Sequence, residues 1–107
     1  MKVERLVAGL AADLKVAGQL LVEYNGDRIV VFWNDGEIRA LNDVCIHRKR
    51  ELSRGAILNG RIVCPGHQWS FDLTTGFCRE RERFQPVYTV AIEDENVVVD
   101  YIPRPAE

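Results

Sequence analysis

Two short segments that each combine a cysteine with a histidine constrain this chain more than any other feature. Cys45-x-His47 and Cys64-x-x-His67, the first and second clips, are separated by sixteen residues and contain both histidines and two of the three cysteines. A lone cysteine or a lone histidine is usually only structural. Four such residues in two clips are typical of a metal centre whose ligands come from two loops.

Zinc is one candidate metal, because two cysteines and two histidines can bind it tetrahedrally. Ligands within one zinc clip are usually separated by about two to five residues, so Cys-x-His is tight for a single ion. Two irons relax this constraint, since the cysteine and histidine of one clip can bind different metals. The spacing therefore favours an iron–sulfur centre, with a zinc-stabilised interaction module as the alternative of a different class.

Short β-branched runs separated by turn residues dominate the rest of the chain and predict a mainly β fold. The expected strands cover residues 19–24, 28–33, 37–41, 61–64, 69–71, 87–92 and 97–101. Asn25-Gly26 predicts a tight hairpin because both residues tolerate positive φ, and Asn34-Asp35-Gly36 predicts a second reversal. Connections this short require mostly antiparallel pairing, since a parallel crossover needs about a dozen residues. Each clip should follow a strand.

One segment before the first expected strand is ambiguous. Leu10, Leu14, Ala17 and Leu21 have helical spacing, which allows a helix over residues 10–21. Gly18 and the β-rich hairpin that follows favour a single short helical turn near Ala11–Leu14 instead.

The length and charge of the chain limit its class. With 107 residues it is expected to form one domain, and a formal net charge of −2 argues against a nucleic-acid binder. Glu4 and Asp13 interrupt the apolar N-terminus, so we expect neither a signal peptide nor a membrane span. A cytoplasmic location is therefore expected, where clustered thiols stay reduced and act as metal ligands.

The sequence resembles the Rieske-type [2Fe–2S] proteins, closest to the small soluble Rieske ferredoxins. The resemblance covers nearly the whole chain and includes both clips, the run 36–42 before the first and the segment 71–76 after the second. It implies a small antiparallel β-sandwich or barrel of Rieske (ISP-like) type, in which two cluster-binding loops form one tip. As a single domain over 1–107, these loops would span about 43–55 and 63–71, and the tail would be frayed over 103–107.

The resemblance also implies one [2Fe–2S] cluster per chain and assigns its ligands. Cys45 and Cys64 would bind the inner iron through sulfur. His47 and His67 would bind the outer iron through imidazole nitrogen, nearer to solvent. Two neutral imidazoles in place of two thiolates raise the reduction potential above that of ferredoxins with four cysteine ligands.

The sequence departs from the respiratory-chain members of the family at several positions. Arg50 and Gly66 stand where those proteins have a disulfide between the two loops, so none can form here. Trp69 and Phe71 stand where those proteins direct a Ser and a Tyr hydroxyl at the cluster. Cys78 matches no ligand position and is interpreted as a structural or incidental thiol.

The expected function is that of a one-electron carrier that passes electrons from a reductase to a terminal oxygenase, without catalysing a reaction itself. A small subunit of an assimilatory nitrite reductase, or another Rieske redox component, is the alternative within the family. The segment 45–67 has a net charge of +4, against −2 for the chain, so partners are expected to dock at the tip near Arg48, Lys49 and Arg50.

Overall fold

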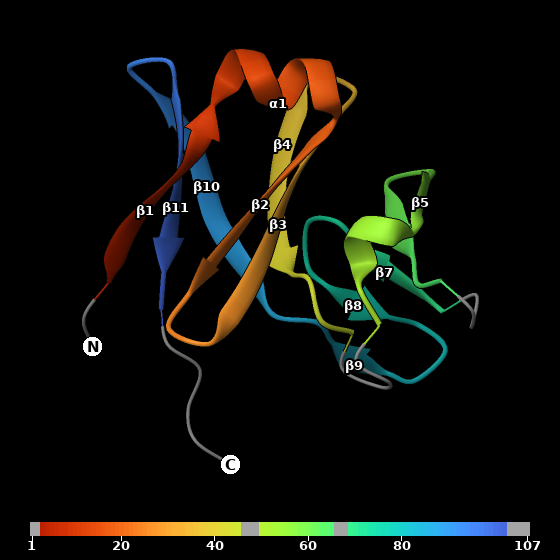
Figure 1. Cartoon of the computed structure of the whole chain (residues 1–107). Helices are drawn as coiled ribbons and strands as arrows, with labels where there is room; N and C mark the ends of the chain where they lie inside the picture. The colour runs from red at the N-terminus through yellow and green to blue at the C-terminus, as the bar shows by residue number, and fades with distance from the viewer. Residues whose placement is uncertain (1–2, 46–49, 66–68, 103–107) are drawn as a thin grey trace.

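The structure is a computed structural model that describes residues 3–45, 50–65 and 69–102 (Figure 1). Its elements are β1 (Glu4–Leu10), α1 (Ala11–Ala17), β2 (Gln19–Tyr24), β3 (Asp27–Asn34), β4 (Glu37–Asn42), the 3-10 turn η1 (Leu52–Arg54), β5 (Ala56–Leu58), β6 (Arg61–Val63), β7 (Ser70–Asp72), β8 (Phe77–Cys78), β9 (Arg83–Phe84), β10 (Val87–Glu93) and β11 (Asn96–Tyr101).

The strands form two antiparallel sheets. The larger has the order β1-β11-β10-β4-β3-β2 and curves until its edge strands approach each other, which gives a nearly closed barrel. The smaller has the order β5-β6-β7-β8-β9 and lies beside one end of the barrel, while α1 covers the opposite end (Figure 1). The predicted antiparallel β-barrel fold is therefore confirmed.

The predicted hairpins are present, for the expected backbone reason. Asn25 and Gly26 have φ of 54° and 83°, and Asp35 and Gly36 have φ of 51° and 79°. Two successive residues with positive φ form the tight turn whose twist matches the flanking strands. These turns fix the register of β2, β3 and β4, in which Tyr24 faces Asp27 and Asn34 faces Glu37.

The helix differs from both sequence interpretations. It spans Ala11–Ala17, so a single turn near Ala11–Leu14 is too short and a helix over residues 10–21 is too long. Gly18 ends it in the left-handed conformation, with φ of 86° and its N–H bonded to the Leu14 carbonyl at 2.7 Å. Leu21, which shares the helical spacing, instead lies in β2 opposite Val30.

Strand β3 is buried on both faces and joins two hydrophobic cores. Ile29 and Val31 face the barrel core, whereas Val30 and Phe32 belong to a second core beneath the small sheet. Side chains alternate between the two faces of a strand, which explains this division and the nearly continuous apolar run of β3. The second core contains Cys45, Leu41, Leu52, Ile62, Cys64, Phe71, Leu73 and Cys78.

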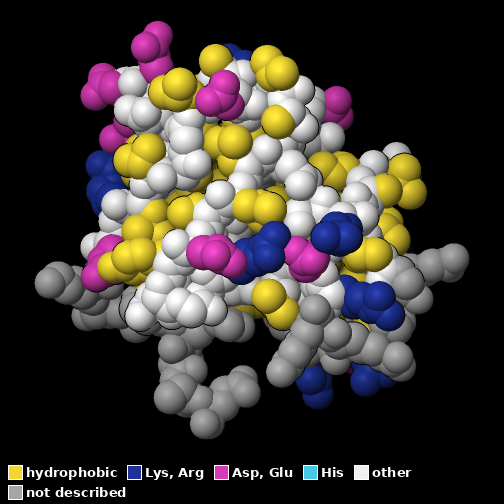
Figure 2. Space-filling model, viewed as in Figure 1, with side chains coloured by type: hydrophobic (Ala, Val, Ile, Leu, Met, Phe, Trp, Pro, Cys, Tyr) yellow, Lys and Arg dark blue, Asp and Glu magenta, His cyan; other side chains and the backbone are white. Residues whose placement is uncertain are grey.

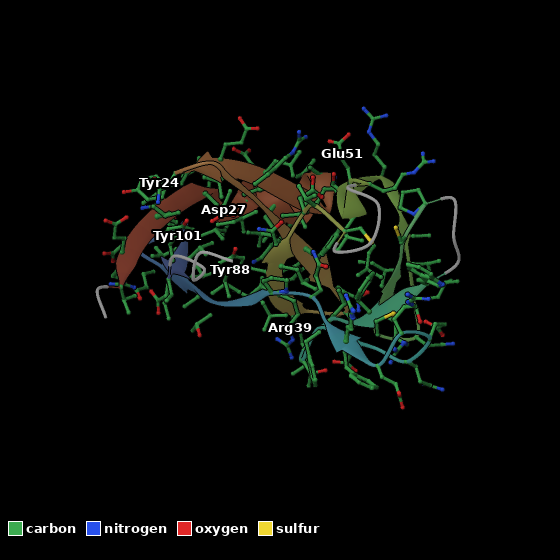
Figure 3. All side chains as sticks on the ribbon, turned by 90° about the horizontal axis from the view of Figure 1, so that it is seen from below. Tyr24, Asp27, Arg39, Glu51, Tyr88 and Tyr101 are labelled. Atoms are coloured by element: carbon green, nitrogen blue, oxygen red, sulfur yellow. The ribbon has the colours of Figure 1, made fainter. Side chains whose placement is uncertain are left out.

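A polar group closes the end of the barrel away from α1. The Tyr101 hydroxyl donates to the Asp27 carboxylate, which also accepts a 3.4 Å contact from the Asn42 side-chain amide. The Tyr101 ring is stacked on Tyr88 and meets Tyr24 edge-on, with centroids 6.1 Å and 5.1 Å away. Figure 3 shows these aromatic residues grouped with Asp27, away from Glu51.

Candidate metal centre

The first clip follows β4 and is held at its base by main-chain bonds. The Cys45 N–H donates to the Arg50 carbonyl at 2.7 Å, and Val44 forms an isolated antiparallel bridge with Glu51. The two ends of the first loop are therefore paired with each other, and this pairing fixes the position of the Cys45 side chain. That side chain is buried, with 1% exposed.

Asp43 anchors this loop from below. Its fully buried carboxylate accepts hydrogen bonds from the N–H and the hydroxyl of Ser53, at 2.6 and 3.2 Å. Its Oδ2 lies 3.0 Å from Arg28 Nε, and Arg28 Nη2 lies 2.8 Å from a Glu51 carboxylate oxygen. A buried carboxylate requires such partners, because isolated burial of a charge is costly. The network ties both ends of the loop to β3.

Gln85, a residue far along the sequence, holds the start of the same loop through its side chain. This buried residue precedes β10, and its side-chain amide donates 2.7 Å hydrogen bonds to the carbonyls of Asn42 and Val44. Both carbonyls lie just before Cys45. No sequence motif predicts a role for Gln85, and the one signal for Asp43 is its position two residues before Cys45.

The second clip follows β6 in a similar way. The Cys64 N–H donates to the Trp69 carbonyl at 2.7 Å, and the Cys64 side chain is 1% exposed. The next residue, Ser70, donates its N–H to the Glu80 carboxylate at 3.0 Å. The Arg81 guanidinium lies over the Trp69 ring, 5.0 Å from its centroid. The β8–β9 turn therefore packs against the end of this loop.

Gly55 brings the two loops into contact. A Cβ at this position would lie 2.0 Å from the Val63 carbonyl oxygen, a distance that no real side chain tolerates. Only glycine lets the end of the first loop approach the strand that leads into Cys64. The role of Gly55 was not predicted from the sequence either, because this close approach depends on packing rather than on a local motif.

The structure brings the two predicted cysteine ligands together. Burial is the main cause that raises the pKa of Cys64 to about 12, and the hydrogen bond and charge of the Cys45 side chain raise it further. The positive charge of Arg50 lowers the same pKa. The Cys64 thiol therefore keeps its proton unless a metal displaces it. Soft thiolate ligands held this close fit an iron–sulfur cluster.

The two predicted histidine ligands are not among the described residues. His47, His67 and the neighbouring Arg48, Lys49 and Gly66 lie outside the described residues. The described part of the chain therefore contributes the two thiols, and it contains no group of three or more metal-ligating side chains. Arg50 is described and exposed.

Cys78 is the third cysteine of the second core. It is fully buried, and burial raises the pKa of its thiol. Its Sγ lies 3.7 Å from the Glu80 carboxylate, which accepts the Ser70 N–H, so the thiol contacts the turn that packs on the second loop. The charge of Cys78 also contributes to the raised pKa of Cys64.

The family model for the Rieske [2Fe-2S] domain matches residues 4–97, a span that includes both loops. The chain belongs to the Rieske [2Fe-2S] domain family. This result confirms the resemblance and the [2Fe–2S] cofactor, and it decides against the zinc-stabilised module. The fold around the two thiols is thus that of a Rieske domain.

Relatives of this Rieske domain include ferredoxin components of dioxygenase systems. The chain is 30% identical to the naphthalene 1,2-dioxygenase system ferredoxin component of Pseudomonas putida over 94% of this chain and 98% of the relative. It is 34% identical to the biphenyl dioxygenase ferredoxin subunit of Pseudomonas sp. (strain KKS102), over 77% and 78%. The Sphingomonas yanoikuyae B1 ferredoxin structure has a TM-score of 0.76 and 26% identity, over 92% and 100%.

Among the described residues of this Rieske domain, no helix is long and apolar enough to cross a bilayer.

Proposed function

We propose that this chain is a Rieske ferredoxin, a one-electron carrier between a reductase and a terminal oxygenase. The observation that carries the proposal is the meeting of Cys45 and Cys64, buried side by side in two loops that are braced from the barrel and from the small sheet. The relatives named as ferredoxin components of dioxygenase systems support the same role and favour it over the nitrite reductase alternative.

The proposed ligand set is Cys45 and Cys64 on one iron and His47 and His67 on the other, with one cluster in a single domain over 1–107. The two buried thiols support the first pair. The second pair rests on the sequence motif and on the family, in which two histidines replace two cysteines on one iron. When bound, such a cluster takes up and releases one electron.

The chain's own residues hold the site and exclude water from its inner side; they do not transform a substrate. A four-ligand set leaves neither iron with an open position, which a substrate would require. The relatives that the chain matches over most of their own length are likewise named as ferredoxin subunits or components. The partners are therefore proteins, and we propose that they dock at the tip near Arg48, Lys49 and Arg50. A cytoplasmic location, where thiols stay reduced, completes the proposal.

Metal analysis and spectroscopy of the protein purified from cells supplied with iron test this function. We expect about two irons and two acid-labile sulfides per chain, a coloured oxidised form, and a paramagnetic form after one-electron reduction. Stoichiometric zinc in a colourless sample would overturn the proposal. Loss of colour on substituting His47 or His67, with Cys45 and Cys64 retained, would support the mixed ligand set.

A further inference from the structure

The arginines that the structure describes fall into two groups. Those of the barrel, of η1 and of β6 are paired with carboxylates: Arg5 with Glu93 and Asp100, Arg28 with Asp43 and Glu51, Arg39 with Glu37, Arg54 with Glu51, and Arg61 with Asp72. Arg50, Arg79, Arg81 and Arg83 are exposed, and no carboxylate of the described residues lies within ion-pair distance of them. Among the described arginines, positive charge without a carboxylate partner is therefore confined to these four residues.

Two of the unpaired arginines lie beside the proposed cluster site. The Arg50 carbonyl accepts the Cys45 N–H. The Arg81 guanidinium lies over Trp69, whose carbonyl accepts the Cys64 N–H. Arg50 and Arg81 therefore lie beside the first and second loops respectively.

The β8–β9 turn supplies the other two arginines. Arg83 faces Cys78 across the β8–β9 pair, so its side chain lies on the sheet face that covers the second core. The sequence of the turn, Arg79-Glu80-Arg81-Glu82-Arg83, alternates in charge and therefore gave no sign of a basic surface. In the structure the Glu80 carboxylate accepts a hydrogen bond from the Ser70 N–H. Of the two acidic residues of the turn, Glu82 is therefore the one that is not bonded to a described group.

We propose that Arg79, Arg81 and Arg83 form, with Arg50, a basic docking arc that receives an acidic face of the electron-transfer partner. This inference rests on the proposed function and extends the docking site from the first loop to the β8–β9 turn. Figure 2 shows Lys and Arg side chains gathered over the small sheet and Asp and Glu side chains mainly over the barrel. Such a charge distribution orients the molecule so that the cluster end meets the partner first.

Two small cobalt complexes can test the arc without the natural partner. Cobalt(III)–EDTA is an anion and stands in for an acidic face, whereas hexaamminecobalt(III) is a cation. In each reaction one electron passes from the reduced protein to Co(III), which becomes Co(II). A change in the protein's reduction potential alters both rate constants in the same direction. A change in charge near the electron exit, the part of the surface through which the electron leaves the protein, alters them in opposite directions. The ratio of the anionic to the cationic rate constant therefore reports local charge.

The variants are Arg81→Glu and Arg83→Glu, and the matched control is Lys15→Glu. Lys15 also stacks on a tryptophan, with Nζ 5.2 Å from the Trp33 ring centroid, but it lies on α1 at the far end of the barrel. All three substitutions change the net charge by the same amount. Arg83→Glu leaves the Trp69 contact of Arg81 in place, so it separates charge from packing.

At about 10 mM salt we expect the rate ratio to fall at least about tenfold in each arginine variant and about twofold in Lys15→Glu, because the Debye length of about 30 Å at this ionic strength leaves nearby charges little screened. In about 1 M salt the rate ratio of each arginine variant should lie much nearer to that of the wild type. Equal ratios in Arg83→Glu and Lys15→Glu, at equal cluster content, would overturn the docking arc while leaving the proposed function intact. A wild-type protein without a reducible cluster would overturn both.

Discussion

Asp43 Oδ2 lies 3.0 Å from Arg28 Nε, and the Asp43 side chain is fully buried. This pair joins β3 to the residue two positions before Cys45, so a contact of the barrel determines where the first cysteine lies. The Ser53 bonds to the same carboxylate connect it to the far end of the loop. The buried Asp43 carboxylate therefore connects both ends of the first loop to the barrel.

Replacing this carboxylate by an amide in Asp43→Asn should loosen the first loop. Removing one partner of a buried ion pair costs about 3–5 kcal/mol, and less when the other partner is partly exposed, as Arg28 is here. We expect the rate at which the visible colour is lost in urea with an iron chelator to rise by more than about tenfold, which corresponds to about 1.4 kcal/mol. Glu37→Gln, the same change in an exposed pair with Arg39, should have little effect. Equal rates in the two variants would contradict this role.

Gln85→Leu should weaken the loop from its other side. The substitution removes the donor to the buried carbonyl of Asn42 and to the partly buried carbonyl of Val44. An unsatisfied buried group costs about 1–3 kcal/mol, so the same colour-loss assay should show at least about a tenfold acceleration. Gln19→Leu, on the partly exposed strand β2, is the control. If the two leucine variants lose colour equally fast, the Gln85 bonds do not hold the loop.

Local patterns predicted the barrel meander and the cysteine pair because both depend on residues close in sequence. Asn25-Gly26 fixes a hairpin through its own dihedral angles, and each clip contains its own candidate ligands. Strand β1 was not predicted, because it pairs with β11 almost a whole chain length away and contains a bulge between Val7 and Gly9. No local signal specifies such a partner.

The supports of the site escaped prediction for a related reason. Gly55 matters because of the Val63 carbonyl, and Gln85 matters because of carbonyls more than forty residues earlier. Arg61 shows the converse case. It contributes to the net charge of the segment 45–67, but its guanidinium donates to Ser70 and to the Phe77 carbonyl and is largely buried. Charge counted along a sequence does not reveal which charges are already engaged.

Cys78→Ser should retain the cluster, whereas Cys64→Ser should lose it. Both thiols are buried in the same core, so the comparison separates ligation from packing. A serine hydroxyl at position 78 can donate to the Glu80 carboxylate, which already lies 3.7 Å from the thiol. We therefore expect the visible spectrum and two irons per chain in Cys78→Ser, and neither in Cys64→Ser. A colourless Cys78→Ser protein would make the ligand assignment wrong.

The midpoint potential should lie in the lower part of the Rieske range, nearer to about −150 mV than to about +300 mV. Hydrogen bonds to a cluster stabilise its more negative reduced state, and hydroxyl donors are absent from Trp69 and Phe71. Phe71 is fully buried in the core that holds both cysteines, so it presents only hydrocarbon there. Protein-film voltammetry at neutral pH gives the value directly, and a clearly positive midpoint would contradict the argument.

Tyr101 should make the barrel sensitive to alkaline pH. Its hydrogen bond to Asp27 is the main cause that raises the pKa of Tyr101 above the usual value, followed by burial. The folded state therefore holds this proton more tightly than the unfolded state does. The resulting stabilisation is complete below the ordinary tyrosine pKa of about 10 and is lost as the pH rises through the raised value.

The measurement compares the urea midpoints of the wild type and Tyr101→Phe from pH 8 to pH 11.5, a range that spans the ordinary pKa of about 10. Phenylalanine keeps the ring that stacks on Tyr88 but has no proton to lose. The wild type should be more stable at pH 8, and the difference should narrow above about pH 10 because the wild type alone loses the Asp27 bond. Other titrating groups are common to both proteins and cancel in the difference. A gap that is the same at every pH would show that the Tyr101 hydroxyl does not control alkaline stability.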